Sequence, residues 1–210
     1  MSTRSAADRA RPDGRTRLLD TAEELLDRHG IDGVSVRAVT KASGHRNSSA
    51  VNYHFGSREQ LVTAVLARRQ AAVEQRRMQM LDTLESSRDR QPREAIAAAV
   101  VPLVELLASV EGRRYLRLLH QAANHPGYYR RSITEYSPSI IRGWRVVAPL
   151  VEHLPEELRH HRFRLGIGMA VAALAEQSRL IDAPDPPRPP LAADVFAADL
   201  IDAVVGALRA

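Results

Sequence analysis

Residues 44–57, GHRNSSAVNYHFGS, decide how the N-terminal part of the chain folds. This stretch places small polar side chains directly before an aromatic cluster that runs from Tyr53 to Phe55. A core helix would not carry so many Asn and Ser side chains, and a helix surrounded by water would not end in aromatic residues. The stretch therefore predicts a short helix whose two sides have different partners.

Two helices are predicted before this stretch. Apolar residues recur at helical spacing over residues 13–29, and Gly30 suits the left-handed position that follows a helix. Ser35 can cap a second, short helix, which Gly44 ends.

The quoted stretch itself predicts a third helix over residues 48–54, capped by Asn47. Ser57 is followed three residues later by Gln60, which is the capping-box pattern. This pattern predicts the start of a long helix that continues to about residue 85.

Helical periodicity also dominates the rest of the chain, and a proline-rich segment over residues 182–190 predicts an extended connector. The further predicted helices cover residues 92–107, 115–122, 138–154, 155–180 and 191–208. No segment alternates apolar and polar residues with a period of two, so we predict an all-α protein.

The composition fits a globular protein with an anionic partner. The formal net charge is +5, and Lys41 is the only lysine, so arginine supplies nearly all the positive charge. This balance suits nucleic acid, although arginines scattered over a solvated surface would give the same composition. The chain has no Cys, which excludes disulfides and thiolate metal sites. No apolar run approaches the roughly 20 residues of a membrane span, and no secretory signal is recognisable, so we expect a cytoplasmic protein without cofactor or membrane partner.

Two short helices joined by a tight turn and packed on a longer helix are the parts of a helix-turn-helix. The second short helix then lies in the DNA major groove, about 12 Å wide, so its outer face must be polar and compact. The residues that meet this requirement are Asn47, Ser48, Ser49 and Asn52. Any one of them also fits an ordinary polar turn with a helix cap, so the ordered set of signals carries the prediction.

The residues at the two ends of this helix have separate predicted roles. His45 and Arg46, at its start, can meet a guanine edge or a phosphate. Tyr53, His54 and Phe55 are expected to hold the helix against the rest of its domain, while the Tyr53 hydroxyl can reach a phosphate.

Residues 15–66 resemble the N-terminal DNA-binding domain of the TetR family of bacterial transcriptional regulators. The motifs that carry the resemblance are LLDTAEELLDRHG, a Ser-Val-Arg helix start, an Ala-Ser-Gly turn and the YHFGSREQL junction, in that order. The resemblance implies a dimeric all-α repressor whose larger C-terminal domain binds a small effector. By position, it also implies that Ser35 and Arg37 contact phosphates, that residues 47–53 form the recognition helix and that Arg58 reaches the DNA backbone.

The chain departs from the common family pattern between Gly44 and Phe55, where it has one residue more than usual. The turn before the recognition helix is therefore expected to be longer. Asn52 stands where a tyrosine is frequent and Tyr53 follows it, so either residue could make the corresponding phosphate contact.

The predicted organisation has three parts: a flexible basic arm over residues 1–12, a DNA-binding domain over residues 13–60, and a helical effector-binding and dimerisation domain over residues 61–210. The last two predicted helices carry small residues and a broad apolar face, so a pair from each chain could form a four-helix bundle across a twofold axis. The expected interface residues are Leu158, Leu165, Ala172, Val195, Ile201, Val205 and Leu208. The same helices could instead form the core of a monomer.

Some residues of the C-terminal helices carry a polar group or a sulfur atom where their neighbours are aliphatic, and these are candidates to line an effector cavity. They are Tyr115, His120, Asn124, Trp144, Met169 and Gln177. Such a mixed pocket would suit a largely apolar molecule with one or two polar groups. Each residue could equally be a hydrogen-bonded core residue or a surface residue.

We therefore expect a transcriptional regulator, most simply a repressor that binds a palindromic operator as a dimer and is released by a small effector. A DNA-binding factor of the same fold without a small-molecule switch, or an activator, would share the same DNA contacts. No enzyme is expected, because the chain lacks a P-loop, a nucleophile elbow and a dinucleotide fingerprint. His160 and His161 are adjacent, so on a helix they point in different directions and cannot share a metal ion.

Overall fold

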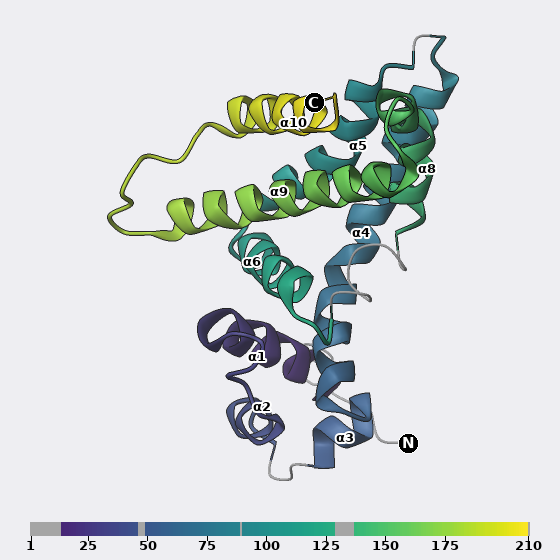
Figure 1. Cartoon of the computed structure of the whole chain (residues 1–210). Helices are drawn as coiled ribbons and strands as arrows, with labels where there is room; N and C mark the ends of the chain where they lie inside the picture. Colours follow the sequence, from purple (N-terminus) through teal and green to yellow (C-terminus); the bar gives the residue numbers. More distant parts are fainter. Residues whose placement is uncertain (1–13, 46–48, 89, 129–136, 210) are drawn as a thin grey trace, which may run out of the picture. The chain divides into compact units, whose positions relative to one another are not determined.

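A computed structural model describes residues 14–45, 49–88, 90–128 and 137–209, and the regular structure of these residues is entirely helical. The prediction of an all-α protein is confirmed. The chain forms two compact units, residues 1–68 and residues 69–210 (Figure 1). The predicted arm over residues 1–12 and the predicted cap at Asn47 lie outside the described residues.

In its described part, the N-terminal unit has three helices and the start of a fourth. They are α1 (Gly14–His29), α2 (Val36–Ala42), α3 (Ser49–Phe55) and the first turns of α4 (Arg58–Ser86). Helix α1 packs on α2, and α2 packs on α3. The buried side of α1 carries Leu18, Ala22 and Leu26, which are four residues apart and so lie on one face of the helix.

The predicted helix boundaries in this unit follow from local hydrogen bonds. The Ser35 hydroxyl accepts from the Ala38 amide at 3.1 Å, and the Ser57 hydroxyl accepts from the Gln60 amide at 3.1 Å. Gly30 and Gly44 follow α1 and α2 and both have a φ of 77°. Glycine adopts this left-handed conformation easily because it has no Cβ, whereas other residues rarely adopt it. The predicted caps at Ser35 and Ser57 are therefore confirmed.

The described residues of the C-terminal unit form the rest of α4 and five further α-helices. They are α5 (Pro92–Val104), α6 (Val110–Asn124), α8 (Pro138–Val147), α9 (Glu156–Asp182) and α10 (Ala193–Arg209). Helix α9 packs on α6 and α10, while α5 packs on α8 and α10 (Figure 1).

Two predicted helices of this unit end earlier than expected. The helix predicted over residues 92–107 ends at Val104, where a 3₁₀ turn, η2 (Glu105–Ala108), follows. Periodicity predicted a helix over residues 138–154, but α8 ends at Val147 and a 3₁₀ turn, η3 (Ala148–Val151), follows. Pro149 explains the change, because it has no amide hydrogen to donate to the preceding turn.

A buried glutamine fixes the return of the chain from α9 to α10. The amide Nε2 of Gln177 donates to the Leu191 carbonyl at 2.7 Å, and Gln177 itself is buried. This carbonyl belongs to the connector, and α10 begins at Ala193 rather than at residue 191 as predicted.

A charged cluster ties α6 to the end of α9. The guanidinium groups of Arg113 and Arg117 each donate to one carboxylate oxygen of Asp182, both at 2.6 Å. Partial burial by itself would raise the pKa of Asp182, but the hydrogen bonds from Arg117 and Arg113 outweigh that effect and hold this pKa below its ordinary value of 3.8.

We expect Asp182→Asn to lower the free energy of unfolding at neutral pH by about 1 kcal/mol, because two charge-assisted hydrogen bonds weaken. A carboxyl whose pKa is lower in the folded state stabilises the fold above its unfolded pKa, and this contribution disappears as pH falls through the folded pKa. The difference from wild type should therefore shrink as pH falls below about 4. Urea unfolding at pH 7, 5 and 3.5 measures it.

The matched control for this prediction is Glu176→Gln on the same helix, which removes a carboxylate from exposed ion pairs with Arg179 of α9 and Arg188 of the connector. Its effect should stay below about 0.5 kcal/mol. A difference between Asp182→Asn and wild type that stays constant with pH would contradict the assignment.

Candidate DNA interface and effector cavity

Helix α3 presents a polar face and a buried face. Val51 and Phe55 are buried, whereas Ser49, Asn52 and Tyr53 are exposed. Ser49 and Asn52 are three residues apart, so their side chains lie close together on the helix surface. A short helix with a compact polar outer face matches the requirements of the DNA major groove.

The three aromatic residues at the end of α3 differ in how far they are buried. The ring of Phe55 is buried, and the guanidinium carbon of Arg15 lies 5.1 Å from its centroid. His54 is partly buried and meets Tyr53 edge to face, with 4.9 Å between ring centroids. Tyr53 is 85% exposed, so the prediction that it holds the helix against its domain is wrong. Its ring and hydroxyl are instead accessible on the surface.

Other predicted contact residues lie at the two ends of α2. Ser35 and Arg37, at its start, are exposed, and the Ser35 hydroxyl, although it accepts from a backbone amide, keeps its own hydrogen to donate. His45 follows the end of α2 and is partly buried, with Nδ1 2.9 Å from the Ser43 hydroxyl.

Three predicted contact residues, Arg46, Asn47 and Ser48, lie outside the described residues, and so does the longer turn expected before α3.

Arg58 has partners within its own unit. Its Nε donates to the Val34 carbonyl at 2.8 Å, and Nη2 donates to the Ile31 carbonyl. These carbonyls belong to the connection between α1 and α2, so the guanidinium ties this connection to the first turn of α4. Sequence patterns do not show this role, because the bonded residues are 24 and 27 positions apart.

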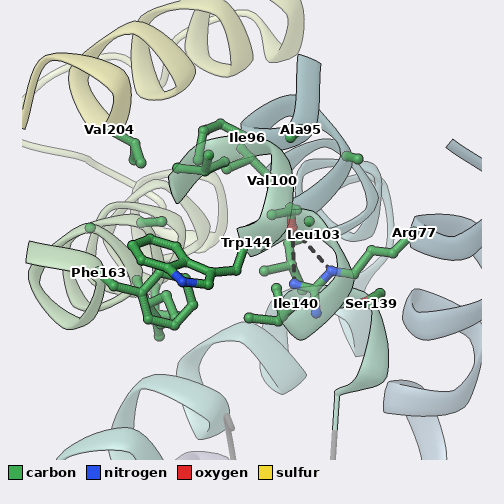
Figure 2. A pocket seen from close by; sticks show the side chains of 18 of the residues that line it. Arg77, Ala95, Ile96, Val100, Leu103, Ser139, Ile140, Trp144, Phe163 and Val204 are labelled. Atoms are coloured by element: carbon green, nitrogen blue, oxygen red, sulfur yellow. Dashed lines mark hydrogen bonds between the residues drawn. The ribbon is translucent and has the colours of Figure 1, made fainter. Parts of the chain in front are cut away.

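A cavity of about 90 Å³ lies in the C-terminal unit and is lined by residues of α4, α5, α6, α8, α9 and α10. Most of its lining is aliphatic, and the rings of Trp144 and Phe163 meet there edge to face with centroids 4.6 Å apart. Figure 2 shows these rings on one side and Arg77 reaching in from the other. Gln70, Arg77 and Ser139 are the polar side chains of its lining.

Of the six residues predicted to line an effector cavity, Trp144 lines this one and Tyr115 does not. Tyr115 is buried and donates its hydroxyl at 2.9 Å to Oε1 of Gln70, which does line the cavity, and burial raises the pKa of Tyr115 to about 12. Its phenol is therefore neutral at physiological pH.

The other four predicted residues, His120, Asn124, Met169 and Gln177, do not line this cavity. The Asn124 side chain donates to the His120 carbonyl at 2.8 Å, one turn away on α6, and Gln177 bonds the connector.

The polar wall of the cavity was not predicted. Arg77 is buried, and its Nε and Nη2 donate to the Ala99 carbonyl at 3.1 and 2.9 Å. Glu74, one turn before it on α4, accepts from the amide and hydroxyl of Ser139 at 2.6 and 2.8 Å and from the Ser137 hydroxyl at 2.7 Å. The sequence gives no local sign of this network, because an Arg and a Glu on a long helix are typical of a solvated face.

The seven predicted interface residues fall into two groups. Leu158, Leu165 and Val195 are 46%, 52% and 53% exposed, and Ala172 is partly exposed. The remaining three, Ile201, Val205 and Leu208, are buried within the protomer, where they support α10 from inside.

Among the described residues, no group of three His, Asp or Glu side chains could hold a metal ion. No helix in the described part of the chain is both long and apolar enough to cross a membrane.

Solved structures of bacterial regulators share this fold. The protein SCO7518 of Streptomyces coelicolor A3(2) is 18% identical, with a TM-score of 0.53 over 92% of this chain and 99% of that one. The TetR family transcriptional regulator PfmR of Thermus thermophilus is 17% identical, with a TM-score of 0.54 over 90% and 97% of the two chains. A TetR family transcription regulator of Marinobacter aquaeolei is 18% identical, with a TM-score of 0.52 over 92% and 94%.

Two family models match the sequence itself. The model for bacterial regulatory proteins of the tetR family matches residues 18–65, and the model for the tetracyclin repressor-like C-terminal domain matches residues 97–207, more than half of the chain. A comparison with curated proteins gave no match. The members of the matched family regulate transcription and are not enzymes. The helix-turn-helix geometry and both matches agree, and the chain belongs to the TetR family of bacterial transcriptional regulators.

Proposed function

We propose that this TetR-family regulator represses transcription in the cytoplasm, binding a palindromic operator as a homodimer until a small, largely apolar effector releases it. The observation that carries the proposal is α3, which is anchored by Val51 and Phe55 and exposes Ser49, Asn52 and Tyr53. We assign DNA binding to residues 13–60, and effector binding and dimerisation to residues 61–210.

In this proposal, the residues of α3 read the operator and those of α2 position the domain. Asn52 can form two hydrogen bonds to an adenine edge, and Ser49, beside it, can bond a base or a phosphate. Tyr53 is exposed enough to reach the DNA backbone with its hydroxyl. Ser35 and Arg37, at the start of α2, contact phosphates. His45 and the residues over 46–48 complete the interface at the start of the recognition helix.

Arg58 has a different proposed role from these contact residues. Its hydrogen bonds to the Val34 and Ile31 carbonyls hold the connection between α1 and α2, which positions α2 for its phosphate contacts. Its influence on DNA binding is therefore mainly indirect.

The proposed dimer joins the exposed faces of α9 and α10. Leu158, Leu165 and Ala172 recur every seven residues, so they form one line along α9, and Val195 extends the exposed apolar surface onto α10. Two such helices from each protomer would form a four-helix bundle. A twofold dimer places two recognition helices on successive major grooves, about 34 Å apart or a multiple of that distance, which requires a palindromic operator.

The cavity supports a regulator with an effector over a factor without one. Gln70, Arg77 and Leu81 of α4 line it, and the same helix begins at Arg58 within the N-terminal unit. An effector that displaces this part of α4 therefore acts on an element that also belongs to the DNA-binding unit. A coupling free energy of about 1 to 3 kcal/mol is typical of such regulation.

The first test measures binding by fluorescence anisotropy to the DNA upstream of the protein's own gene and to scrambled DNA of equal length, at about 150 mM salt. We expect binding to the upstream fragment to be tighter by a factor of about 10³ or more. Failure to prefer that fragment, or any fragment selected from the genome, over scrambled DNA would contradict the proposal.

Two substitutions should separate base reading from phosphate contact. Asn52→Ala should weaken operator binding by roughly 1 to 3 kcal/mol and leave binding to scrambled DNA nearly unchanged. The matched variant Arg37→Gln should weaken binding to both DNAs and reduce the slope of log affinity against log salt by about one unit. Equal losses on both DNAs for Asn52→Ala would show that Asn52 contacts phosphate only.

The dimer is tested by placing a charge on its proposed surface. Leu165→Asp should convert the dimer to a monomer of 23.3 kDa in analytical ultracentrifugation at micromolar concentration, because each copy would bury an unpaired carboxylate. Val110→Asp is the control, since Val110 is 46% exposed at the start of α6. A wild-type monomer, or a Leu165→Asp variant that remains dimeric, would refute this interface.

A further inference from the structure

We propose that the cavity selects carboxylates: its ligand is a compact apolar molecule that carries one carboxylate group, and Arg77 binds that group. The inference rests on the proposed function, because it assigns the chemical class of the effector.

Arg77 has hydrogen-bonding capacity left over. Its side chain lines the cavity, and the residue is only 7% exposed. Three of its five N–H groups are used: Nε and Nη2 donate to the Ala99 carbonyl, and Nη1 makes a longer bond of 3.4 Å to the Ser137 hydroxyl. Two N–H groups, one on each terminal nitrogen, have no acceptor among the described residues. A carboxylate can accept from both terminal nitrogens of one guanidinium.

The charge of Arg77 also lacks a direct counterion. No carboxylate within the described ranges forms a hydrogen bond with the guanidinium. Glu74 carries the neighbouring negative charge, but its oxygens accept from Ser137 and from the amide and hydroxyl of Ser139. Glu74 does not line the cavity, whereas Arg77 does, so the charge presented to a ligand is positive. A buried cation without a hydrogen-bonded counterion favours an anion over a neutral group.

The remaining walls define the rest of the ligand. Trp144 and Phe163 offer aromatic surface opposite Arg77 (Figure 2), and Ala98 and Gly143 are among the small residues that leave room. The cavity volume of about 90 Å³ favours a short aliphatic chain or a single ring over a polycyclic molecule. Burial of the apolar part of the ligand would supply most of the affinity, and the guanidinium would supply the selectivity for a carboxylate.

The experiment compares carboxylates with their neutral amides on the full-length wild-type protein, without DNA. The probes are butyrate, hexanoate, octanoate, benzoate and phenylacetate, each paired with the amide of the same shape. Calorimetry and thermal unfolding should show saturable binding of at least one carboxylate, about 10-fold or more tighter than its amide. Equal affinity within every pair, or no binding by any carboxylate, would overturn the inference.

Variants test whether Arg77 is the anchor. Arg77→Met removes the hydrogen-bond donors, but it also leaves the negative charge of Glu74 without the neighbouring positive charge. The double variant Arg77→Met/Glu74→Gln removes both charges, so the net charge of the site is unchanged from wild type. Carboxylate affinity should fall by about 10- to 100-fold in both variants, while amide affinity changes little. A folded double variant that binds carboxylates as tightly as wild type would refute the role of Arg77.

Gly143→Ala is the control for cavity size. A Cβ at this position would lie 3.7 Å from Leu81 Cδ2 and 4.0 Å from the Ala95 carbonyl oxygen, which are ordinary contacts, so the variant should fold. Because it narrows the cavity without changing its charge, it should weaken carboxylates and amides to the same degree. If Gly143→Ala lowered the affinity for carboxylates but not for amides, then Arg77 would not be the source of the selectivity between them.

The DNA-binding measurement keeps this inference separate from the proposed function. Carboxylate binding by a protein that never prefers an operator would support the cavity assignment and refute the regulatory role. Operator binding by a protein that accepts none of the carboxylates would do the opposite.

Discussion

The rest of the structure depends on α4, because this one helix must satisfy two different environments. Its first turns bury Leu61, Val62 and Val65 in the DNA-binding unit, and its later turns bring Gln70 and Arg77 to the cavity of the C-terminal unit. A single helix therefore carries residues of both proposed functions. A substitution that disturbs the buried face of α4 can therefore affect both units.

Several arginines in the described part of this chain join segments of the fold to one another. Arg58 and Arg77 bond backbone carbonyls, Arg142 binds Glu85 through two hydrogen bonds of 2.7 Å, and Arg113 and Arg117 share Asp182. The planar guanidinium suits these tasks because it is weakly hydrated and presents several donors in a fixed geometry. The net charge of +5 is therefore a poor measure of DNA-binding surface, and exposed residues such as Arg37 are more informative than the total.

The parts of the fold that could be predicted from the sequence are those that depend on residues close together in the chain. The caps at Ser35 and Ser57 each join residues three positions apart, so the pattern contains the whole interaction. The Arg77 bond to Ala99 spans 22 positions, and no local pattern records it. A polar residue within an apolar helix was also an ambiguous sign of a ligand cavity. Trp144 lines the cavity, but Gln177 does not: its side chain bonds a carbonyl of the connector.

The buried guanidinium of Arg77 is difficult to explain by stability alone. Replacing a buried charged group with an apolar residue of similar volume is often neutral or stabilising, and filling a cavity usually stabilises a protein. Here a charged group with unused donors lies at a cavity whose lining is mostly apolar. A filled, uncharged core would hold α4 and α5 together at least as well, but it would leave no place for an effector. The combination suits the effector-controlled switch proposed here, because a ligand that binds the folded state adds its binding free energy to the stability of that state.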